Sequence, residues 1–281
     1  MRVPNRVVIQ LNGGIGNILF QLAAGESLKF ATGITPTFTE AKPGHLDRLE
    51  AYVGNVFERE TTKPSRQIPD SASRHVLRSG LRKTQALIGA QIEIPPHQEF
   101  EWIEILPRIP IIPIQLRGYF QSPSSISEGI QSVLQMLENT IPFELEEKAV
   151  LHLRRGDYVT LDWALPIDYY RRALTTTSLQ PGSQIRIVGE DVMAILGMEQ
   201  IVMAAGFTVA SSLSPTNSAL NDFARLSSSP IQILSNSSFS WWGAALATHR
   251  LGKENVEQIG PKTWTPILQS EVMIQSHWKC C

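Results

Sequence analysis

The sequence predicts an α/β protein with two Rossmann-like domains that face each other, each built on a parallel sheet. Short apolar strands alternate with helical segments through the second half of the chain, and a strand, a glycine turn and a helix open the first half. Strands that alternate with helices form right-handed βαβ units, in which the strands run parallel. The 281 residues suit one large domain or two modest ones, and a boundary near Ile141–Pro142 gives domains 1–141 and 142–281.

The first domain opens with its clearest unit. The β-branched run Val7–Leu11 predicts a strand, and Asn12–Asn17 predicts a turn. Apolar residues then recur at helical spacing from Phe20 until Gly33 ends the helix. Prolines recur between residues 60 and 125, where they break long elements and predict strands joined by loops.

The second half of the chain predicts a regular alternation of elements. Its helices are expected at 127–139, 167–174, 192–205, 219–226 and 239–247, and its strands at 149–153, 184–188, 207–210 and 231–234. Ligands of open α/β sheets bind beyond the carboxyl ends of the strands, so the segments that follow strands are the candidate binding segments. These segments are 13–17, 152–157, 189–191 and 235–240.

Composition excludes several classes of protein. The chain has 25 Lys and Arg residues against 26 Asp and Glu residues, a balance that argues against a nucleic-acid partner. Hydrophobic residues make up 42% and charged residues 18%, which excludes a disordered chain. No apolar run approaches the roughly 18 residues that span a bilayer, and the N-terminus lacks the pattern of a signal peptide. We therefore expect a cytoplasmic protein with at most peripheral contact with the inner membrane.

Two of the candidate segments offer groups for an anionic ligand. The glycines of 13–16 let backbone N–H groups approach a ligand ahead of a helix, although a tight strand-to-helix turn has the same pattern. Arg154 and Arg155 leave a strand, and adjacent side chains on extended backbone point to opposite faces. We expect Arg154 to meet the ligand and Arg155 to pair with an acid such as Asp157. The alternative is that both arginines form structural ion pairs.

A run of small hydrogen-bond donors at 235–240 precedes an apolar helix. Hydroxyl and N–H groups at a helix N-terminus suit a phosphate group, and ordinary helix capping is the alternative. Trp241 and Trp242 are expected in the core in either case. The chain has no Asp-x-Asp, the carboxylate pair with which enzymes often hold a nucleotide diphosphate through a metal. Arginine and a helix N-terminus would have to neutralise a pyrophosphate instead, so we expect no metal and no cofactor.

Three stretches together resemble a known family. Residues 13–21, 152–158 and 235–243 resemble the successive signatures of the bacterial type of the α-1,2-fucosyltransferase family, and 260–264 resembles a further signature. Enzymes of this family use GDP-fucose and invert the configuration of the transferred sugar. The resemblance implies a GT-B-like fold, in which the first domain lies on the acceptor side and the second binds GDP-fucose. The last helix is a candidate for packing back on the first domain.

The resemblance implies roles for residues that would bind the donor. His152 and Asp191 match positions that bond the guanine edge, and Arg154 matches the pyrophosphate arginine. The sequence departs from the family at two places: Ile18 stands where Gln is usual, and 188–191 reads Val-Gly-Glu-Asp where Phe-Ser-Asp-Asp is usual.

Two further groups of donor-binding residues follow from the same resemblance. Ser237, Ser238 and Phe239 match the phosphate-binding turn. Gly14 and Asn17 match an N-terminal loop that closes over the donor.

The implied reaction is inverting transfer of L-fucose from GDP-β-L-fucose to the 2-hydroxyl of a terminal β-galactose. Arg154 and the Ser238 region would stabilise the phosphate charge that grows as GDP leaves. The candidates for a general base are Asp157, Asp162 and Asp168, and we take Asp157 as the catalytic candidate beside Arg154. Asp157 also suits a structural role that orients an arginine, and water or a donor phosphate oxygen could take the proton instead.

Two other functions stay open. The chain could be a metal-independent glycosyltransferase with another sugar nucleotide, or a non-catalytic carbohydrate- or nucleotide-binding protein. The acceptor, an oligosaccharide or a glycolipid precursor, is not identified by the sequence, and neither is the oligomeric state. The basic segment 63–83 suits a solvated helix face or a surface that steers the protein to an anionic membrane or a lipid-linked pyrophosphate. Cys280 and Cys281 are expected to be exposed thiols on a frayed tail.

Overall fold

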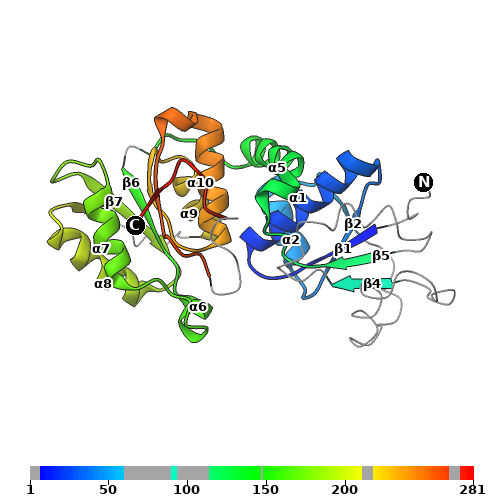
Figure 1. The fold of residues 1–281 in the computed structure, drawn as a ribbon, viewed down its shortest axis with the longest axis horizontal. Helices are drawn as coiled ribbons and strands as arrows, with labels where there is room; N and C mark the ends of the chain where they lie inside the picture. Colours follow the sequence, from blue (N-terminus) through cyan, green and yellow to red (C-terminus); the bar gives the residue numbers. More distant parts are fainter. Residues whose placement is uncertain (1–6, 60–89, 94–113, 147, 211–217, 266–272) are drawn as a thin grey trace. The chain divides into compact units, whose positions relative to one another are not determined.

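The computed structural model describes residues 7–59, 90–93, 114–146, 148–210, 218–265 and 273–281 (Figure 1). The chain divides into two compact units, Met1–Met136 and Leu137–Cys281. Each unit holds one sheet in which every described strand pair is parallel. The predicted α/β class with two parallel sheets is confirmed. The basic segment 63–83 lies outside the described residues.

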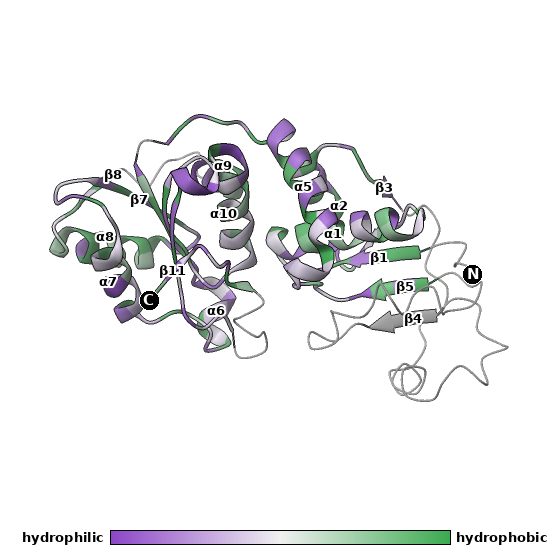
Figure 2. Cartoon of the chain, turned by 45° about the horizontal axis from the view of Figure 1, so that its top comes forward, coloured by the Kyte–Doolittle hydropathy of each residue, from purple (hydrophilic) through white to green (hydrophobic). Residues whose placement is uncertain are grey.

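The sheet of the first unit has the strand order β3-β2-β1-β5-β4. Its strands are β1 (Val7–Leu11), β2 (Thr37–Glu40), β3 (Glu58–Arg59), β4 (Ala90–Glu93) and β5 (Ile114–Arg117). The described helical elements are α1 (Ile15–Thr32), α2 (His45–Val53), η3 (Pro123–Ile126) and α5 (Ser127–Thr140). Strands β1 and β5 carry both apolar and polar residues (Figure 2), and the side chains of Ile9 and Leu116 are fully buried.

Helix α5 approaches α1 closely at Gly129. A Cβ atom at this position would lie 1.8 Å from the carbonyl oxygen of Ala23, so no larger residue fits. The backbone N–H of Gly129 donates to Oγ of Ser27 over 2.9 Å. This close contact fixes the start of α5 on the first unit.

The sheet of the second unit has the strand order β11-β10-β9-β6-β7-β8. Its strands are β6 (Ala149–Leu153), β7 (Gln184–Gly189), β8 (Thr208–Ala210), β9 (Ile231–Ile233), β10 (Glu257–Gly260) and β11 (Lys279–Cys280). Its helical elements are α6 (Gly156–Thr160), α7 (Ile167–Thr176), α8 (Val192–Ala204), α9 (Ala219–Leu226), α10 (Ser238–Leu251) and η4 (Lys253–Asn255).

Alternation along β6 separates the core of the second unit into two layers. Ala149, Leu151 and Leu153 pack with α7 and α8 in one apolar cluster. His152 points to the other face, where it meets Ser240 of α10, because successive strand residues face opposite sides. Strand β6 and helix α9 have the predicted bounds, and α10 extends beyond its predicted end.

The C-terminal tail is ordered, which corrects the expectation of a frayed end. Lys279–Cys280 forms β11, which pairs with β10. Two contacts hold it: the indole N–H of the buried Trp278 donates to Oε1 of Gln258 over 2.8 Å, and Lys279 forms an ion pair with Glu257. These partners are distant in sequence, which is why the tail alone gave no sign of them. Within the described ranges, no helix is both long and apolar enough to cross a membrane.

Candidate functional site

The candidate site lies at the carboxyl edge of the second unit's sheet. Strands β9, β6 and β7 are neighbours and parallel, so the segments that follow them meet at one edge. These segments hold Arg154, Glu190 and the turn 234–238 that leads into α10. The fold therefore brings together three of the four segments that the sequence predicted, and the fourth, 13–17, belongs to the first unit.

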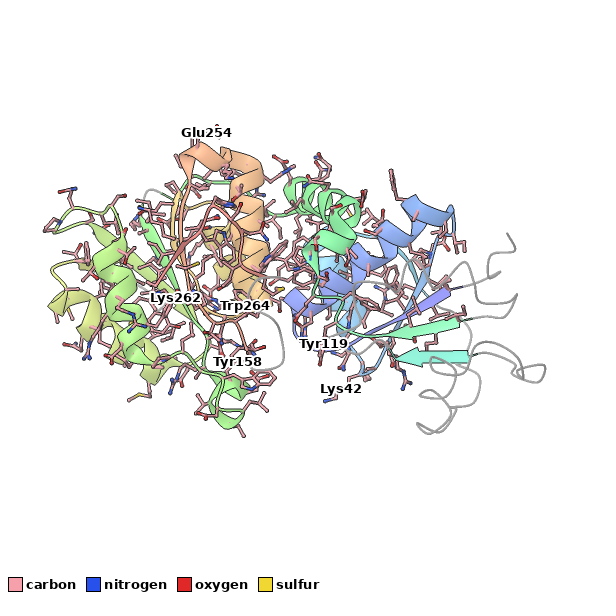
Figure 3. All side chains as sticks on the ribbon, viewed as in Figure 1. Lys42, Tyr119, Tyr158, Glu254, Lys262 and Trp264 are labelled. Carbon is pink, nitrogen blue, oxygen red and sulfur yellow. The ribbon has the colours of Figure 1, made fainter. Side chains whose placement is uncertain are left out.

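Arg154 forms two ion pairs at this edge. Its Nη2 lies 2.5 Å from Oδ1 of Asp157, and its Nη1 lies 3.2 Å from Oε1 of Glu190. The ring of Tyr158 faces the guanidinium carbon, with 5.0 Å between that carbon and the ring centroid. Tyr158 is labelled in Figure 3.

The predicted pairing of Arg155 with Asp157 is wrong, because Arg154 holds that carboxylate. The prediction assumed an extended chain. Gly156 instead adopts a φ of +39°, and α6 begins there. The turn brings Asp157 back beside Arg154, three positions earlier in the sequence.

Glu190 was not singled out by the sequence. Its Oε1 accepts the backbone N–H of Arg155 over 3.2 Å, in addition to its contact with Arg154. A Cβ atom at position 156 would lie 2.7 Å from the same oxygen, and the positive φ of this residue favours glycine as well. The one feature of the sequence that could have identified Glu190 is its position directly after a predicted strand.

His152 is buried and neutral. Nδ1 lies 2.5 Å from Oγ of Ser240 and 2.9 Å from Oγ of Ser235. Burial, together with the nearby charge of Arg154, lowers the pKa of His152 to about 3. The imidazole also packs against Phe239, with ring centroids 5.1 Å apart. The ring thus joins the end of β6 to the start of α10 without carrying charge.

The serine-rich turn caps α10. Oγ of Ser237 accepts the backbone N–H of Phe239 over 3.2 Å. Nδ2 of Asn236 donates to the carbonyl oxygens of Trp163 and Trp264, both over 2.8 Å, and so ties two other loops to the turn. Ser238 begins the helix, whose 14 residues direct a partial positive charge toward this edge. In this geometry the turn can cap the helix and also bind a phosphate group.

The two tryptophans that follow the turn lie in the core, as the sequence predicted. Trp241 is 2% exposed and Trp242 is fully buried. The indole N–H of Trp241 donates to the carbonyl oxygen of Met273 over 2.9 Å. These residues anchor α10 rather than face a ligand.

Asp191, matched to the guanine edge by resemblance, caps a helix. Its Oδ1 accepts the backbone N–H of Ala194 over 3.0 Å at the start of α8. One carboxylate oxygen is therefore already engaged in local structure.

Asp222 on α9 is a second buried acid that sequence reasoning missed. It is 8% exposed, and burial raises its pKa to about 6, opposed by Arg225 and the Gly189 N–H. Its Oδ1 lies 3.7 Å from Nη1 of Arg225 and has no hydrogen-bond partner among the described residues. The neighbouring Phe223 packs on Phe239, with centroids 5.4 Å apart, so Asp222 is linked to the layer that holds the imidazole. Helical periodicity marks Phe223 as buried but gives no sign that an acid is buried beside it.

The remaining candidate bases differ in their surroundings. Asp168 forms an exposed ion pair with Arg171 over 3.0 Å, and Asp162 follows α6 with a φ of +55°. Asp157 bonds Arg154 and so belongs to the site. In the described ranges, no group of three or more His, Cys, Asp or Glu side chains is placed to hold a metal ion.

The glycine turn of the first unit begins α1. Gly13 adopts a φ of +85°, Gly14 is the N-cap residue, and a Cβ atom at position 14 would meet open space. Oδ1 of Asn17 accepts the side-chain N–H of Gln121 over 2.7 Å. The turn therefore leaves the backbone at Gly14 accessible at the carboxyl end of β1.

Comparison with known proteins gives a family match and fold matches. The model of the family described as glycosyl transferase family 11 matches residues 115–265. The chain is 26% identical over 289 residues to the O-antigen biosynthesis glycosyltransferase WbnK of Escherichia coli. This alignment covers 90% of this chain and 93% of that protein.

Solved structures with a similar fold include two nucleotide complexes. An Arabidopsis thaliana FUT1 mutant in complex with GDP has a TM-score of 0.51 and 11% identity, over 86% of this chain and 68% of that chain. The E. coli heptosyltransferase WaaC with ADP has a TM-score of 0.50 and 13% identity, over 98% of this chain and 92% of that chain. The expected GT-B-like fold is confirmed.

Proposed function

The chain belongs to glycosyl transferase family 11, and on this premise we propose that it transfers L-fucose from GDP-β-L-fucose to the 2-hydroxyl of a terminal β-galactose, with inversion and without a metal ion. The observation that carries the proposal is the convergence of Arg154, the N-terminus of α10 and two buried titratable groups, His152 and Asp222, at one sheet edge.

Arg154 and α10 supply positive charge for the diphosphate of the donor. The Arg154 side chain is 30% exposed, and the helix N-terminus presents backbone N–H groups near Ser238. Negative charge grows on the leaving GDP in the transition state, and preorganised donors stabilise that charge by about 3–4 kcal/mol each. The absence of an Asp-x-Asp pair from the sequence agrees with neutralisation by protein groups alone.

A buried carboxylate suits the guanine edge, which presents adjacent N–H donors. Asp191 matches this role by resemblance, and Asp222 is a second, buried carboxylate, whose Oδ1 has an ion pair with Arg225 at 3.7 Å but no hydrogen-bond partner among the described residues. The imidazole of His152, matched to the same edge by resemblance, is neutral, and its Nδ1 already contacts Ser235 and Ser240. We therefore add Asp222 to the donor-binding set.

Asp157 is the candidate base for the acceptor hydroxyl. Its side chain is 63% exposed and bonds Arg154 through Oδ1, so a donor phosphate group bound by Arg154 would lie near it. The acceptor would be a β-galactoside, as an oligosaccharide or a glycolipid precursor.

A single incubation tests donor, reaction and metal independence. Purified protein is mixed with GDP-fucose and lactose in excess EDTA, and the products are followed by mass spectrometry. Addition of one deoxyhexose to lactose, with the linkage read by NMR, supports the proposal. Release of GDP and free fucose keeps the donor but excludes lactose as the acceptor. An intact donor, with UDP rather than GDP competing in a binding assay, would indicate another sugar nucleotide.

A further inference from the structure

We infer that Glu190 is a positioning residue whose carboxylate orients the guanidinium of Arg154 and competes with a donor diphosphate for that guanidinium. The inference rests on the proposed function, because it requires a nucleotide diphosphate at Arg154.

Glu190 contacts two consecutive residues of the turn after β6 and lies close to the third. Its Oε1 lies 3.2 Å from Nη1 of Arg154 and accepts the backbone N–H of Arg155, also over 3.2 Å. The same oxygen comes so close to Gly156 that a side chain there would collide with it. One carboxylate therefore sets both the arginine and the backbone that carries it.

The guanidinium of Arg154 is already surrounded before a ligand arrives. Asp157 holds Nη2, Glu190 holds Nη1, and the ring of Tyr158 faces the guanidinium carbon. Nε is buried and has no hydrogen-bond partner in the described part of the chain. These neighbours fix the plane of the guanidinium, which lowers the entropy cost of binding an anion.

The same carboxylates oppose the anion that Arg154 is placed to bind. A diphosphate at the guanidinium would lie beside two negative charges that share one arginine. Asp157 is carried by α6, and its side chain is 63% exposed, whereas that of Glu190 is 39% exposed. Repulsion between like charges is stronger where less water screens it, so Glu190 is the stronger competitor.

Glu190→Gln separates the orienting contact from the charge. The amide keeps an oxygen that can accept from Arg155, but it carries no negative charge. GDP binding is measured by isothermal titration calorimetry, and the expected Kd is about fivefold lower than that of the wild type. The difference should shrink as salt is added, because ions screen the repulsion.

Glu254→Gln is the matched control. It makes the same change of charge on an exposed residue of η4, which precedes β10 and so lies at the opposite edge of the sheet. Figure 3 shows Glu254 and Tyr158 at opposite ends of the second unit. The Kd of GDP should be unchanged in this variant.

A second variant keeps the test available if Glu190→Gln does not fold. Glu190→Asp retains the charge but withdraws it from Arg154 by one methylene group. It should lower the Kd by less than Glu190→Gln does.

An unchanged or higher Kd in these Glu190 variants would overturn the inference, because it would show that the carboxylate does not compete with the diphosphate. Tighter binding in Glu190→Gln would not be expected from the loss of a purely structural contact. If the wild type binds no GDP, the proposed donor is wrong, and the same comparison with UDP, ADP and inorganic pyrophosphate tests Glu190 independently. If the wild type binds none of these probes, both the proposed function and the inference fail.

Discussion

Nδ1 of His152 lies 2.5 Å from the hydroxyl oxygen of Ser240, and this contact joins the end of β6 to the first turn of α10. The strand leads into Arg154, and the helix begins with the serine-rich turn. The two parts of the proposed phosphate site are thus held together by a side chain that is itself buried and neutral.

The depressed pKa of His152 predicts a specific acid sensitivity. The unfolded chain binds a proton at this residue below the ordinary pKa of 6.5, whereas the folded chain does not until about 3. Stability from this residue is therefore complete above pH 6.5 and falls as the pH drops from 6.5 toward 3, by at most about 1.4 kcal/mol per pH unit. Urea unfolding at pH 7.5 and 5.5 should show a smaller pH effect in His152→Asn than in the wild type.

Equal pH effects in His152→Asn and the wild type would mean that the imidazole is not buried as described.

Asp222 predicts the opposite linkage to pH. Its folded pKa of about 6 lies above the ordinary value of 3.8, so the folded state binds a proton more readily between these values. The ionised form is the costly one, and Asp222→Asn should raise the free energy of unfolding at pH 7.5 by about 1 kcal/mol. If Asp222 accepts from guanine, the same variant should bind GDP at least about tenfold more weakly.

Calorimetry at pH 7.5 and 5.5 tests the binding half of this prediction. Wild-type affinity for GDP should fall at pH 5.5, because a protonated carboxyl group loses acceptor capacity, and the affinity of Asp222→Asn should change less. A variant that is more stable yet binds GDP normally would remove Asp222 from the donor site while keeping its burial.

We expect substitutions at Gly156 and Glu190 to have coupled effects on the free energy of unfolding. Gly156→Ala forces a side chain into a positive φ and against the Glu190 carboxylate, which should cost about 1–2 kcal/mol in backbone strain alone. In a Glu190→Ala background the collision is absent, so the same substitution should cost less. A double-mutant cycle in chemical denaturation measures the difference, and additive effects would show that the contact is not tight.

The sequence predicted the elements well where the signal was local. Val7–Leu11, Ala149–Leu153 and Ala219–Leu226 have their predicted bounds because apolar periodicity and turn residues decide them. The carboxyl-edge segments were predicted for the same reason, since parallel topology gathers them.

The failures concern contacts that depend on backbone turns or on distant partners. The partner of Asp157 depended on the positive φ of Gly156, which residue types alone do not reveal. Burial of Asp222 depends on how α9 packs over β6 and β7. The ordered tail depends on β10, about twenty residues earlier. In each case the residue type was visible but its environment was not.

Arg154→Ala should greatly slow transfer while leaving the fold intact. The side chain is partly exposed and its ion pairs lie at the surface, so the free energy of unfolding should change by no more than about 1 kcal/mol. Loss of a donor aimed at the growing phosphate charge should lower kcat by about 10²–10³. Arg171→Ala, which breaks an exposed ion pair on α7, is the control and should retain full activity. Near-normal turnover in Arg154→Ala would remove its pyrophosphate role, and with it the reason that Glu190 should compete with the donor.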